Sequence, residues 1–322
     1  MVRFVHLAVA TAAAVGFAVP SFAADKVRLI ISTQQSFELF APEQALAEGY
    51  FAKEGLDVSI IYGDGGAATM QTIITGSQDV VTGVGTSAVV AAFAKGAPVR
   101  IIGNGKRGPG PVVWYVPTAS PIKSLKDMDG KTLAFSRPGS TTHTAAQFML
   151  KESGVKAKLV SVGGTAASRT QVMSGQVDTG WTIPPANFDL MVKGEARVIA
   201  DADKETPELN NVPIRVMAAN SDWLAKNPDV ARRFVKAVWK GIVFNHTQPE
   251  PAVRRYAEKW KMDYEMAKAA PRYLSIESQA PNQLGDIEML ERMAVEDKMI
   301  AAPLTAEQRK QLIQIVYDPL KD

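Results

Sequence analysis

The chain has 322 residues, with 36 Lys and Arg against 33 Asp and Glu. Its apolar share of 46% and charged share of 21% are those of a globular protein, and the near balance of charge gives no reason to expect a nucleic-acid partner. The sequence has no cysteine, which excludes disulfides, thiolate nucleophiles and cysteine-ligated metals.

The N-terminal segment has the pattern of an export signal. Arg3 supplies a positive start, residues 4–19 are apolar, and Ser21-Phe22-Ala23 ends in the small residues that signal peptidases cut. The apolar run is shorter than the roughly 20 residues of a membrane-spanning helix, and Pro20 ends it. We expect residues 1–24 to be removed. The product would be free in the periplasm, because a lipid anchor needs a cysteine at the cleavage site.

Behind the signal, short apolar runs typical of strands alternate with amphipathic runs typical of helices. Strands separated by helical crossovers predict a mainly parallel sheet covered by helices on both faces. In such sheets ligands bind beyond the carboxyl ends of the strands. The expected elements of this first series are strands at 27–32, 56–63 and 80–82 and helices at 42–55, from Gly65 and from Gly85.

Two of these helices begin with residues suited to ligand binding. One start is Gly65-Gly66, and the other is Gly85-Thr86-Ser87, directly after an apolar strand. The first N–H groups of a helix lack partners within the helix, and the helix dipole there favours negative charge. Glycine lets the backbone approach a ligand closely. We therefore expect both starts to line a site for a small anion or polar ligand.

A second series follows the Gly- and Pro-rich stretch 103–111 and an extended run at 112–117. Its expected elements are strands at 130–136, 158–164, 176–183 and 195–201 and helices at 142–154 and 165–175. The run 212–219 is expected to return to the first series as a strand, and the rest to be almost entirely helical. This order predicts two lobes joined by two extended crossings. One comprises residues 25–115 with 215–322, and the other residues 116–214.

Three stretches of the chain resemble a known family. They are GSQDVVTGVGTSAVVAAFAKGAPVRII (76–102), SLKDMDGKTLAFSRPGSTTHTAAQFML (124–150), and the stretch that runs from GQVDTGW (175–181) through Pro184-Pro185 to GEARVI (194–199). They are similar to the nitrate-, sulfonate- and taurine-binding branch of the type II periplasmic solute-binding proteins, and to relatives that bind thiamine-pyrimidine precursors. The resemblance implies a two-lobed α/β fold, each lobe a mainly parallel sheet flanked by helices, with a helical C-terminal segment.

The resemblance also implies a function. Such proteins capture a solute by hinge closure and deliver it to the membrane permease of an ABC importer, whose ATPase is a separate chain. We expect a monomer that is not an enzyme, with no cofactor and no metal. Two alternatives remain. One is a ligand sensor module, and the other is an enzyme of the thiamine-pyrimidine synthase type, which the export signal and the lack of cysteine disfavour.

The resemblance places ligand-binding residues on four loops, at the turn after the first strand, the two helix starts, and the turn 137–142 of the second lobe. His143 and Trp181 are added because they lie beside these loops in the predicted cleft. The expected ligand-binding residues are Gln34, Gln35, Phe37, Gly65, Gly66, Thr86, Ser87, Arg137, Ser140, Thr141, Thr142, His143 and Trp181.

Most of these residues have a second interpretation that does not involve ligand. Ser140 suits a helix N-cap, and Arg137 a surface position beside Pro138. Phe37 suits the core or a lid, and Trp181 suits either a ligand cover or packing beneath the Pro184-Pro185 turn. Gln34 and Gln35 are also typical of solvated loops, and His143 of a buried capping turn.

The ligand class follows from the second-lobe turn. Hydroxyls of Ser140, Thr141 and Thr142 beside Arg137, at a helix start, favour a small organic anion of sulfonate, taurine or carboxylate type. Glu38 and Asp64 lie near the same loops and would suit an amine-bearing ligand. A neutral pyrimidine or aromatic compound is the alternative ligand.

Overall fold

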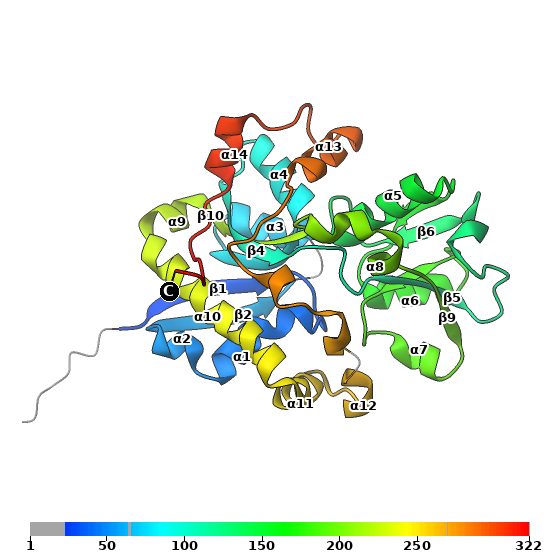
Figure 1. The fold of residues 1–322 in the computed structure, drawn as a ribbon, viewed down its shortest axis with the longest axis horizontal. Helices are drawn as coiled ribbons and strands as arrows, with labels where there is room; N and C mark the ends of the chain where they lie inside the picture. The colour runs from blue at the N-terminus through cyan, green and yellow to red at the C-terminus, as the bar shows by residue number, and fades with distance from the viewer. Residues whose placement is uncertain (1–22, 64–65, 269, 322) are drawn as a thin grey trace, which may run out of the picture.

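The computed structural model describes residues 23–63, 66–268 and 270–321. The chain forms two α/β parts that lie beside each other (Figure 1). We call the part built on a five-stranded sheet the first lobe, and the part built on two smaller sheets the second lobe. The predicted export signal lies outside the described residues except for its last two, and the first strand begins at Asp25, directly after it.

The sheet of the first lobe has the strand order β2-β1-β3-β10-β4. Its strands are β1 (Asp25–Ile31), β2 (Leu56–Tyr62), β3 (Val80–Gly85), β4 (Val99–Lys106) and β10 (Arg215–Asn220). β1 runs parallel to β2 and β3, whereas β10 runs antiparallel to β3 and β4. The strand expected to return from the second series is therefore present, and it inserts between β3 and β4.

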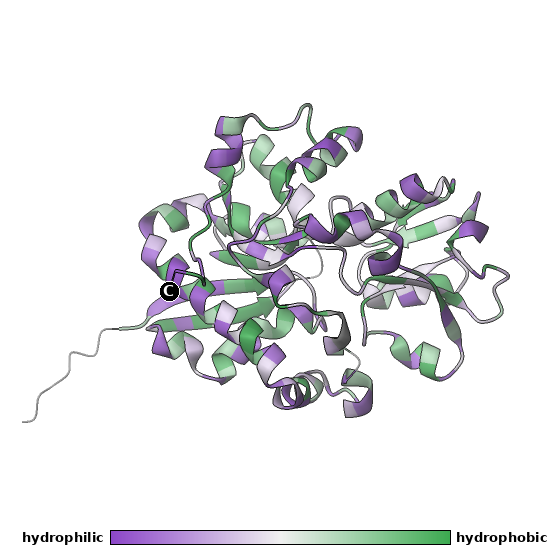
Figure 2. Cartoon of the chain, viewed as in Figure 1, coloured by the Kyte–Doolittle hydropathy of each residue, from purple (hydrophilic) through white to green (hydrophobic). Residues whose placement is uncertain are grey.

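Helices cover both faces of this sheet. Val27 and Leu29 of β1 face one apolar cluster and Ile30 faces the other, as the two-residue alternation of a strand requires. Figure 2 shows the strands mainly in green and the surrounding helices in alternating green and purple. The helices on the first face are α1 (Ala41–Ala47), α2 (Tyr50–Lys53) and α10 (Pro228–Thr247), and those on the second are α3 (Gly66–Ile74), α4 (Thr86–Ala94) and α13 (Glu288–Glu296).

The second lobe has a three-stranded sheet of order β8-β5-β9 and a two-stranded sheet, β6-β7. The strands are β5 (Val113–Pro117), β6 (Thr132–Phe135), β7 (Lys158–Ser161), β8 (Gly180–Thr182) and β9 (Ala196–Asp201). β5 is antiparallel to both of its neighbours, so this sheet is not the mainly parallel one that was expected for the second lobe. The helices are α5 (Thr141–Ser153), α6 (Thr165–Met173), α7 (Phe188–Val192) and α8 (Ala202–Glu205). The buried Trp114 joins the two sheets, since its Nε1 donates to the carbonyl of Ala134 at 2.7 Å.

The two crossings between the lobes run next to each other. One leads from β4 to β5, and the other leads from α8 through a 3₁₀ turn (Pro207–Asn211) to β10. The N–H of Gly108 donates to the carbonyl of Val212 at 2.9 Å, and Arg107 donates to the Asn211 side chain at 2.9 Å. A paired connection of this kind suits rotation of one lobe against the other.

The C-terminal segment is largely helical, but residues 280–287, 297–305 and those from Ile313 onward are not, so the expectation of an almost entirely helical segment is met only in part. Its further elements are α9 (Ser221–Lys226), α11 (Pro249–Trp260), α12 (Tyr264–Ala267), 3₁₀ turns at Ala270–Tyr273 and Glu277–Gln279, and α14 (Ala306–Leu312). Beyond α14 the chain is extended, and the N–H groups of Gln314 and Val316 donate to carbonyls of β4 at 2.8 and 3.2 Å. This pairing covers the β4 edge of the sheet, and no helical periodicity would have predicted it.

These sheets and their covering helices confirm the expected α/β class. In the residues that the structure describes, no helix combines the length and apolarity required to cross a bilayer.

Candidate functional site

A cavity of about 570 Å³ lies between the two lobes. Its walls come from loops at strand ends and from helix starts, which is where a parallel sheet presents free backbone groups. The first lobe contributes Ser32, Thr33, Gln34, Gln35, Gly63, Gly83, Gly85 and Arg215. The second contributes Ser136, Arg137, Ser140, Thr141, Thr142, Val162, Gly163, Gly164, Thr165, Ala166, Ala167, Trp181 and Ile183.

Three helices begin at this cavity. The residues preceding α4, α5 and α6 are Gly85, Ser140 and Gly164, and all three line it. Helix starts carry partial positive charge and unpaired N–H groups. Because three helix starts lie at the cavity, the backbone alone contributes positive electrostatic potential there, in addition to that of the side chains.

Hydroxyl groups at the start of α5 form a closed network. The Ser136 hydroxyl lies 2.7 Å from that of Ser140 and 2.8 Å from that of Thr142, and the latter two are 3.0 Å apart. The Ser140 hydroxyl also caps the helix by accepting from the His143 N–H at 3.2 Å. The two interpretations of Ser140, helix cap and cavity residue, therefore hold together in one side chain.

Arg215 is the buried cation of the cavity. Its Nη1 donates to Glu38 Oε2 at 2.6 Å, and its Nε donates to the Thr141 hydroxyl at 3.0 Å. The two ionic side chains are 7% and 1% exposed, so this ion pair is shielded from solvent. Arg215 belongs to β10 of the first lobe and Thr141 to α5 of the second, so one guanidinium joins both lobes at the cavity wall.

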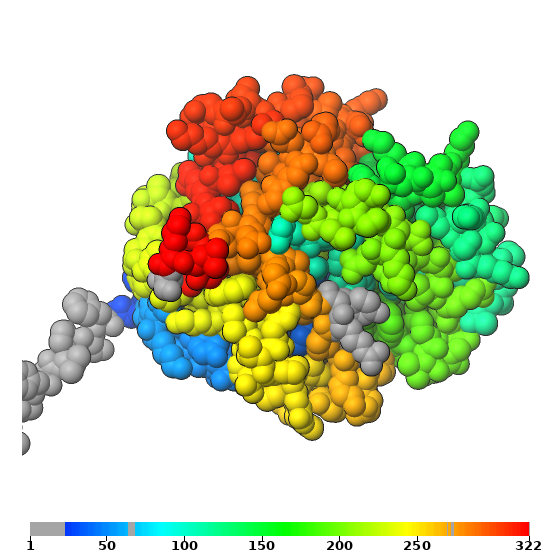
Figure 3. Space-filling view, in the orientation of Figure 1, coloured from blue at the N-terminus to red at the C-terminus, as the bar shows by residue number. Residues whose placement is uncertain are grey.

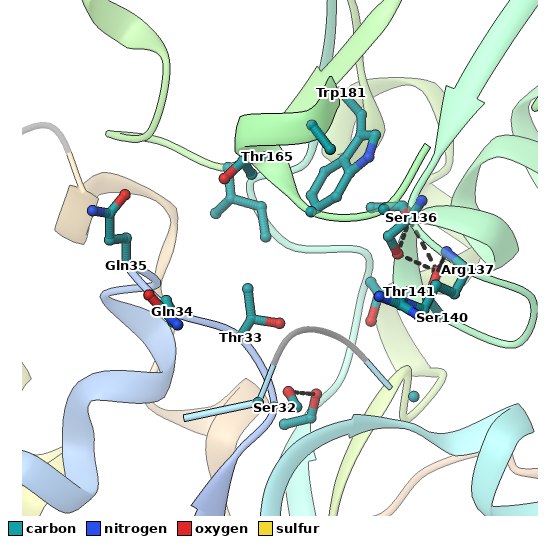
Figure 4. A pocket seen from close by; sticks show the side chains of 18 of the residues that line it. Ser32, Thr33, Gln34, Gln35, Ser136, Arg137, Ser140, Thr141, Thr165 and Trp181 are labelled. Carbon is teal, nitrogen blue, oxygen red and sulfur yellow. Dashed lines mark hydrogen bonds between the residues drawn. The ribbon is translucent and has the colours of Figure 1, made fainter. Parts of the chain in front are cut away.

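One wall of the cavity is apolar. Trp181, Ile183 and Val162 of the second lobe supply it, together with the methyl groups of Ala166 and Ala167. Figure 4 shows Trp181 and Thr165 across the cavity from Thr33 and Gln34, with Ser136, Ser140 and Thr141 at a third side. The cavity thus has a polar, cationic end and an apolar side.

Seven of the expected site residues line this cavity. They are Gln34, Gln35, Arg137, Ser140, Thr141, Thr142 and Trp181. Gly85, the first residue of the expected helix start, also lines it. Gln35 has a φ of 53°, a left-handed conformation that shapes the turn after β1.

Other expected residues lie outside the lining. Phe37 is buried against Tyr256, with ring centroids 5.2 Å apart. The Thr86 hydroxyl donates to the carbonyl of Pro213, and Ser87 is buried in the first turn of α4. These three side chains are buried and do not line the cavity. The start of α4 lines it with Gly85, the residue that precedes the helix. Gly66 begins α3, and Gly65 lies outside the described residues.

Several residues that line the cavity were not predicted from the sequence. Arg215 could have been, because a charged residue within the apolar run VPIRVMAA needs a buried partner. The start of α6 follows a strand through Gly163-Gly164-Thr165, the same arrangement that indicated the helix starts of the first lobe. Ser32, Gly63, Ser136 and Ile183 carried no distinguishing signal.

His143 lies behind the cavity wall, at the seam between the lobes. Its ring stacks on Phe135, and its Nδ1 accepts from the Gly139 N–H at 3.2 Å. Asp297 of the first lobe places a carboxylate oxygen 3.6 Å from the same nitrogen. Burial lowers the pKa of His143 below its ordinary value, and the nearby Asp297 carboxylate opposes this shift only in part.

This environment predicts a pH dependence of stability. Because the pKa of His143 is lower in the folded protein, the stability that neutral His143 contributes is fully present above about pH 6.5 and declines as the pH falls below it. We expect His143→Asn, whose Oδ1 can take the place of Nδ1 as the acceptor for the Gly139 N–H, to flatten the decline of Tm between pH 7.5 and 5.5. An unchanged Tm profile in the variant would show that His143 does not titrate in this range.

The sequence matches the model of the "NMT1/THI5 like" family over residues 43–252, which is more than half of the chain. The riboflavin-binding protein RibY of Chloroflexus aurantiacus is 26% identical over 222 residues, covering 66% of this chain. The chain spans only 60% of the length of RibY in this match.

Two solved structures share the fold. The alkanesulfonate-binding protein SsuA of Xanthomonas axonopodis pv. citri has a TM-score of 0.72 at 16% identity, over 91% of this chain and 99% of its own. The desulfurization enzyme DszB has a TM-score of 0.62 at 14% identity, over 90% and 96% of the two chains. These two structures have one fold, yet one is a binding protein and the other an enzyme. The fold alone therefore does not assign binding or catalysis, which must be argued from the residues of the site.

Proposed function

Because the chain belongs to the NMT1/THI5-like family, we propose that it is a periplasmic binding protein that captures a small organic anion. The ligand would be a sulfonate, taurine or carboxylate type compound. Capture would proceed by closure of the two lobes, followed by delivery to the membrane permease of an ABC importer with a separate ATPase. We propose that the two lobes are the two moving units. The expected boundary after residue 115 falls inside β5, which pairs with β8 and β9 of the second lobe, so the boundary is placed in the crossing that precedes Val113.

The charge of the cavity carries this proposal. Among the described residues that line it, Arg215 and Arg137 are cationic and none is acidic. The Glu38 carboxylate, which was expected to suit an amine-bearing ligand, is 1% exposed and bound to Arg215. Glu38 is not among the residues that line the cavity, so it binds the guanidinium of Arg215 from outside the cavity. Together with three helix starts, this arrangement suits a carboxylate or sulfonate head group.

Closure follows from how the two lobes share the site. The anion would contact Thr33 and Arg215 from one side and Ser140 and Thr141 from the other. Contacts made from both lobes stabilise the closed form only when ligand is present, so binding shifts the population towards closure. The paired crossings would serve as the hinge.

The apolar side of the cavity supports an organic rather than an inorganic anion. An indole and the aliphatic side chains beside it gain by burying a hydrocarbon body. The same wall favours a second candidate, a neutral pyrimidine or aromatic compound. It would fill the apolar side and leave Arg215 with no charged partner beyond Glu38.

Titration calorimetry of the purified mature protein separates these candidates. The panel consists of methanesulfonate, taurine, benzenesulfonate and benzoate, with benzamide and a hydroxymethylpyrimidine as neutral counterparts. We expect at least one anion to bind at least about tenfold more tightly than its neutral counterpart. Neutral compounds that bind as tightly as the anions would overturn the anion proposal.

Catalysis and sensing are the remaining alternatives, and both are testable. No bound ligand should be turned over, so mass spectrometry after prolonged incubation should return the added compound unchanged. Permease and ATPase genes next to this gene would support import, whereas a membrane kinase gene alone would support a sensor module. Cleavage after residue 23 or 24 in protein recovered from the periplasm would support export.

A further inference from the structure

One connection of the C-terminal segment joins the first lobe to the second. It comprises residues 297–305, between α13 and α14. Its Ile300 and Leu304 pack in the same apolar cluster as β3 and α4, so the connection belongs to the first lobe. Its residues Asp297 and Met299 contact α5 and the turn before α5, which belong to the second lobe (Figure 1).

The Asp297 carboxylate makes the polar contacts of this connection. The Gln147 amide of α5 donates to Asp297 Oδ1, and Asp297 Oδ2 lies 3.6 Å from Nδ1 of His143, one turn earlier on α5. The side chains of Asp297 and His143 are 18% and 12% exposed, so solvent screens this contact only in part. Among the described residues, every hydrogen bond and ion pair of the Asp297 side chain is to α5. The side chain therefore serves the contact between the lobes and not the packing of its own lobe.

The position of Asp297 in its own helix leads to the same conclusion. Asp297 is the C-cap of α13, and its N–H donates to the carbonyl of Met293 at 2.9 Å. The C-terminal end of a helix carries partial negative charge, so a carboxylate there is unfavourable for α13. The same carboxylate lies beside the first two turns of α5, where the helix end carries partial positive charge. It is thus stabilised by the second lobe and destabilised by its own helix.

Met299 packs against the turn that leads into α5. A Cβ placed on Gly139 of this turn would lie 2.7 Å from Met299 Cε. The carbonyl of Gly139 also lies against Gly85, so the first lobe contacts this turn at two points. The next residue, Ser140, lines the cavity. The connection therefore contacts the part of the second lobe that carries the cavity hydroxyls.

We propose that Asp297 is a positioning residue for ligand capture, which holds α5 and its cavity residues Ser140, Thr141 and Thr142 in the closed arrangement of the lobes. It does so through Gln147 and His143 and does not line the cavity itself. Ligand contacts from both lobes persist only while the lobes stay closed. The effect on ligand retention rests on the proposed function, whereas the contact between the lobes is testable without ligand.

Distances between two spin labels, one on each lobe, measure the contribution of Asp297. The chain has no cysteine, so Lys126→Cys in the second lobe and Lys310→Cys in α14, both at exposed lysines, provide two unique labelling sites. Pulsed electron paramagnetic resonance of the ligand-free protein should show a population at the label distance of the closed structure. We expect Asp297→Ala to lower the ratio of closed to open molecules at least about fivefold, because hydrogen bonds to charged groups are the stronger ones. Lack of this population in the original protein, or the same ratio in the variant, would overturn the proposal.

The variant Gln147→Ala and the double variant Gln147→Ala with Asp297→Ala identify the contact that is responsible. If the two side chains act through their shared hydrogen bond, the double variant should lower the ratio no further than Asp297→Ala alone. Loss of fold stability by itself would not produce this result. Single effects that multiply in the double variant would show that the two residues act independently, which contradicts the proposal.

The matched control is Asp318→Ala. Asp318 is 26% exposed and accepts from the Asn282 amide at 2.6 Å and from the Leu320 N–H at 3.0 Å, both within the C-terminal segment. Its bonds do not cross between the lobes, so the ratio of closed to open molecules should stay that of the original protein. A decrease as large as that of Asp297→Ala would show that the ratio does not report on the contact with α5, and would overturn the proposal.

Benzenesulfonate serves as the probe for ligand retention. Stopped-flow fluorescence should give a dissociation rate at least about fivefold faster for Asp297→Ala than for the original protein, with little change in the association rate. Equal dissociation rates would contradict a role of Asp297 in the ligand-bound form. If neither benzenesulfonate nor another anion of the panel binds, the proposed function fails, and the spin-label distances still decide the role of Asp297.

Discussion

Replacing Arg215 with Gln is expected to weaken the binding of an organic anion by roughly 100-fold, or about 3 kcal/mol. The guanidinium is buried, it is held by Glu38 and Thr141, and it lines the cavity together with Arg137. A charge–charge contact shielded from water is much stronger than an exposed one. Calorimetry with the anion that binds best in the panel measures the effect.

The single substitution also leaves Glu38 buried without its partner, which can destabilise the fold by itself. The double variant Glu38→Gln with Arg215→Gln removes both charges together and should recover much of the lost stability while still binding the anion weakly. Arg254→Gln changes an exposed arginine that pairs with Glu250, and affinity should not change. A folded Arg215→Gln protein with the original affinity would show that the anion is held elsewhere.

Gly85→Ala is expected to reduce ligand affinity at least about tenfold with little change in the Tm of the ligand-free protein. Gly85 has a φ of −63° and a ψ of 129°, which any residue can adopt, so the backbone does not require glycine. The obstacle is the second lobe. A Cβ on Gly85 would lie 2.3 Å from the carbonyl oxygen of Gly139 and 3.1 Å from the Cα of Ser140.

The methyl group should therefore hold the lobes apart, and an open protein can avoid the clash. Gly241→Ala is the contrasting variant, because its Cβ would lie 2.1 Å from the Ala41 carbonyl within the first lobe. That clash cannot be relieved by opening, so Tm should fall. Small-angle scattering with saturating ligand should show a smaller compaction for Gly85→Ala than for the original protein. Full compaction and full affinity in that variant would contradict closure at this seam.

The C-terminal segment takes part in the same seam. Figure 3 shows the orange residues that precede the C-terminus lying against the green second lobe. Gln147 of α5 donates to Asp297, and His143 approaches the same carboxylate. On the proposed opening of the lobes, these contacts would break together with the one at Gly85, so His143 would affect lobe closure as well as stability.

Local patterns in the sequence were sufficient for much of this architecture. Alternation of apolar runs and helical runs predicted the strands of the first lobe, and the Ser140 capping signal predicted the start of α5. The turn after β1 and the start of α5 do meet in one cavity. Their positions depended on short-range chemistry, such as capping and strand alternation, that a single sequence displays.

Long-range partners are what the sequence could not show. Arg215 and Glu38 are 177 positions apart in the chain, and the sequence around either residue does not indicate that the other is its partner. The sequence allowed Phe37 to lie either in the cleft or in the core. In the structure it lies in the core, because it packs against Tyr256, which is far away in the chain. The extended end of the chain takes its conformation from β4, which lies more than 200 residues earlier.

The most direct test of anion capture is the identity of the ligand that the protein carries from its own periplasm. Protein recovered under native conditions should show one bound molecule per chain by native mass spectrometry. The molecule released on denaturation should be a sulfonate or carboxylate with an apolar body. Recovery of neutral heterocycles alone would contradict the account.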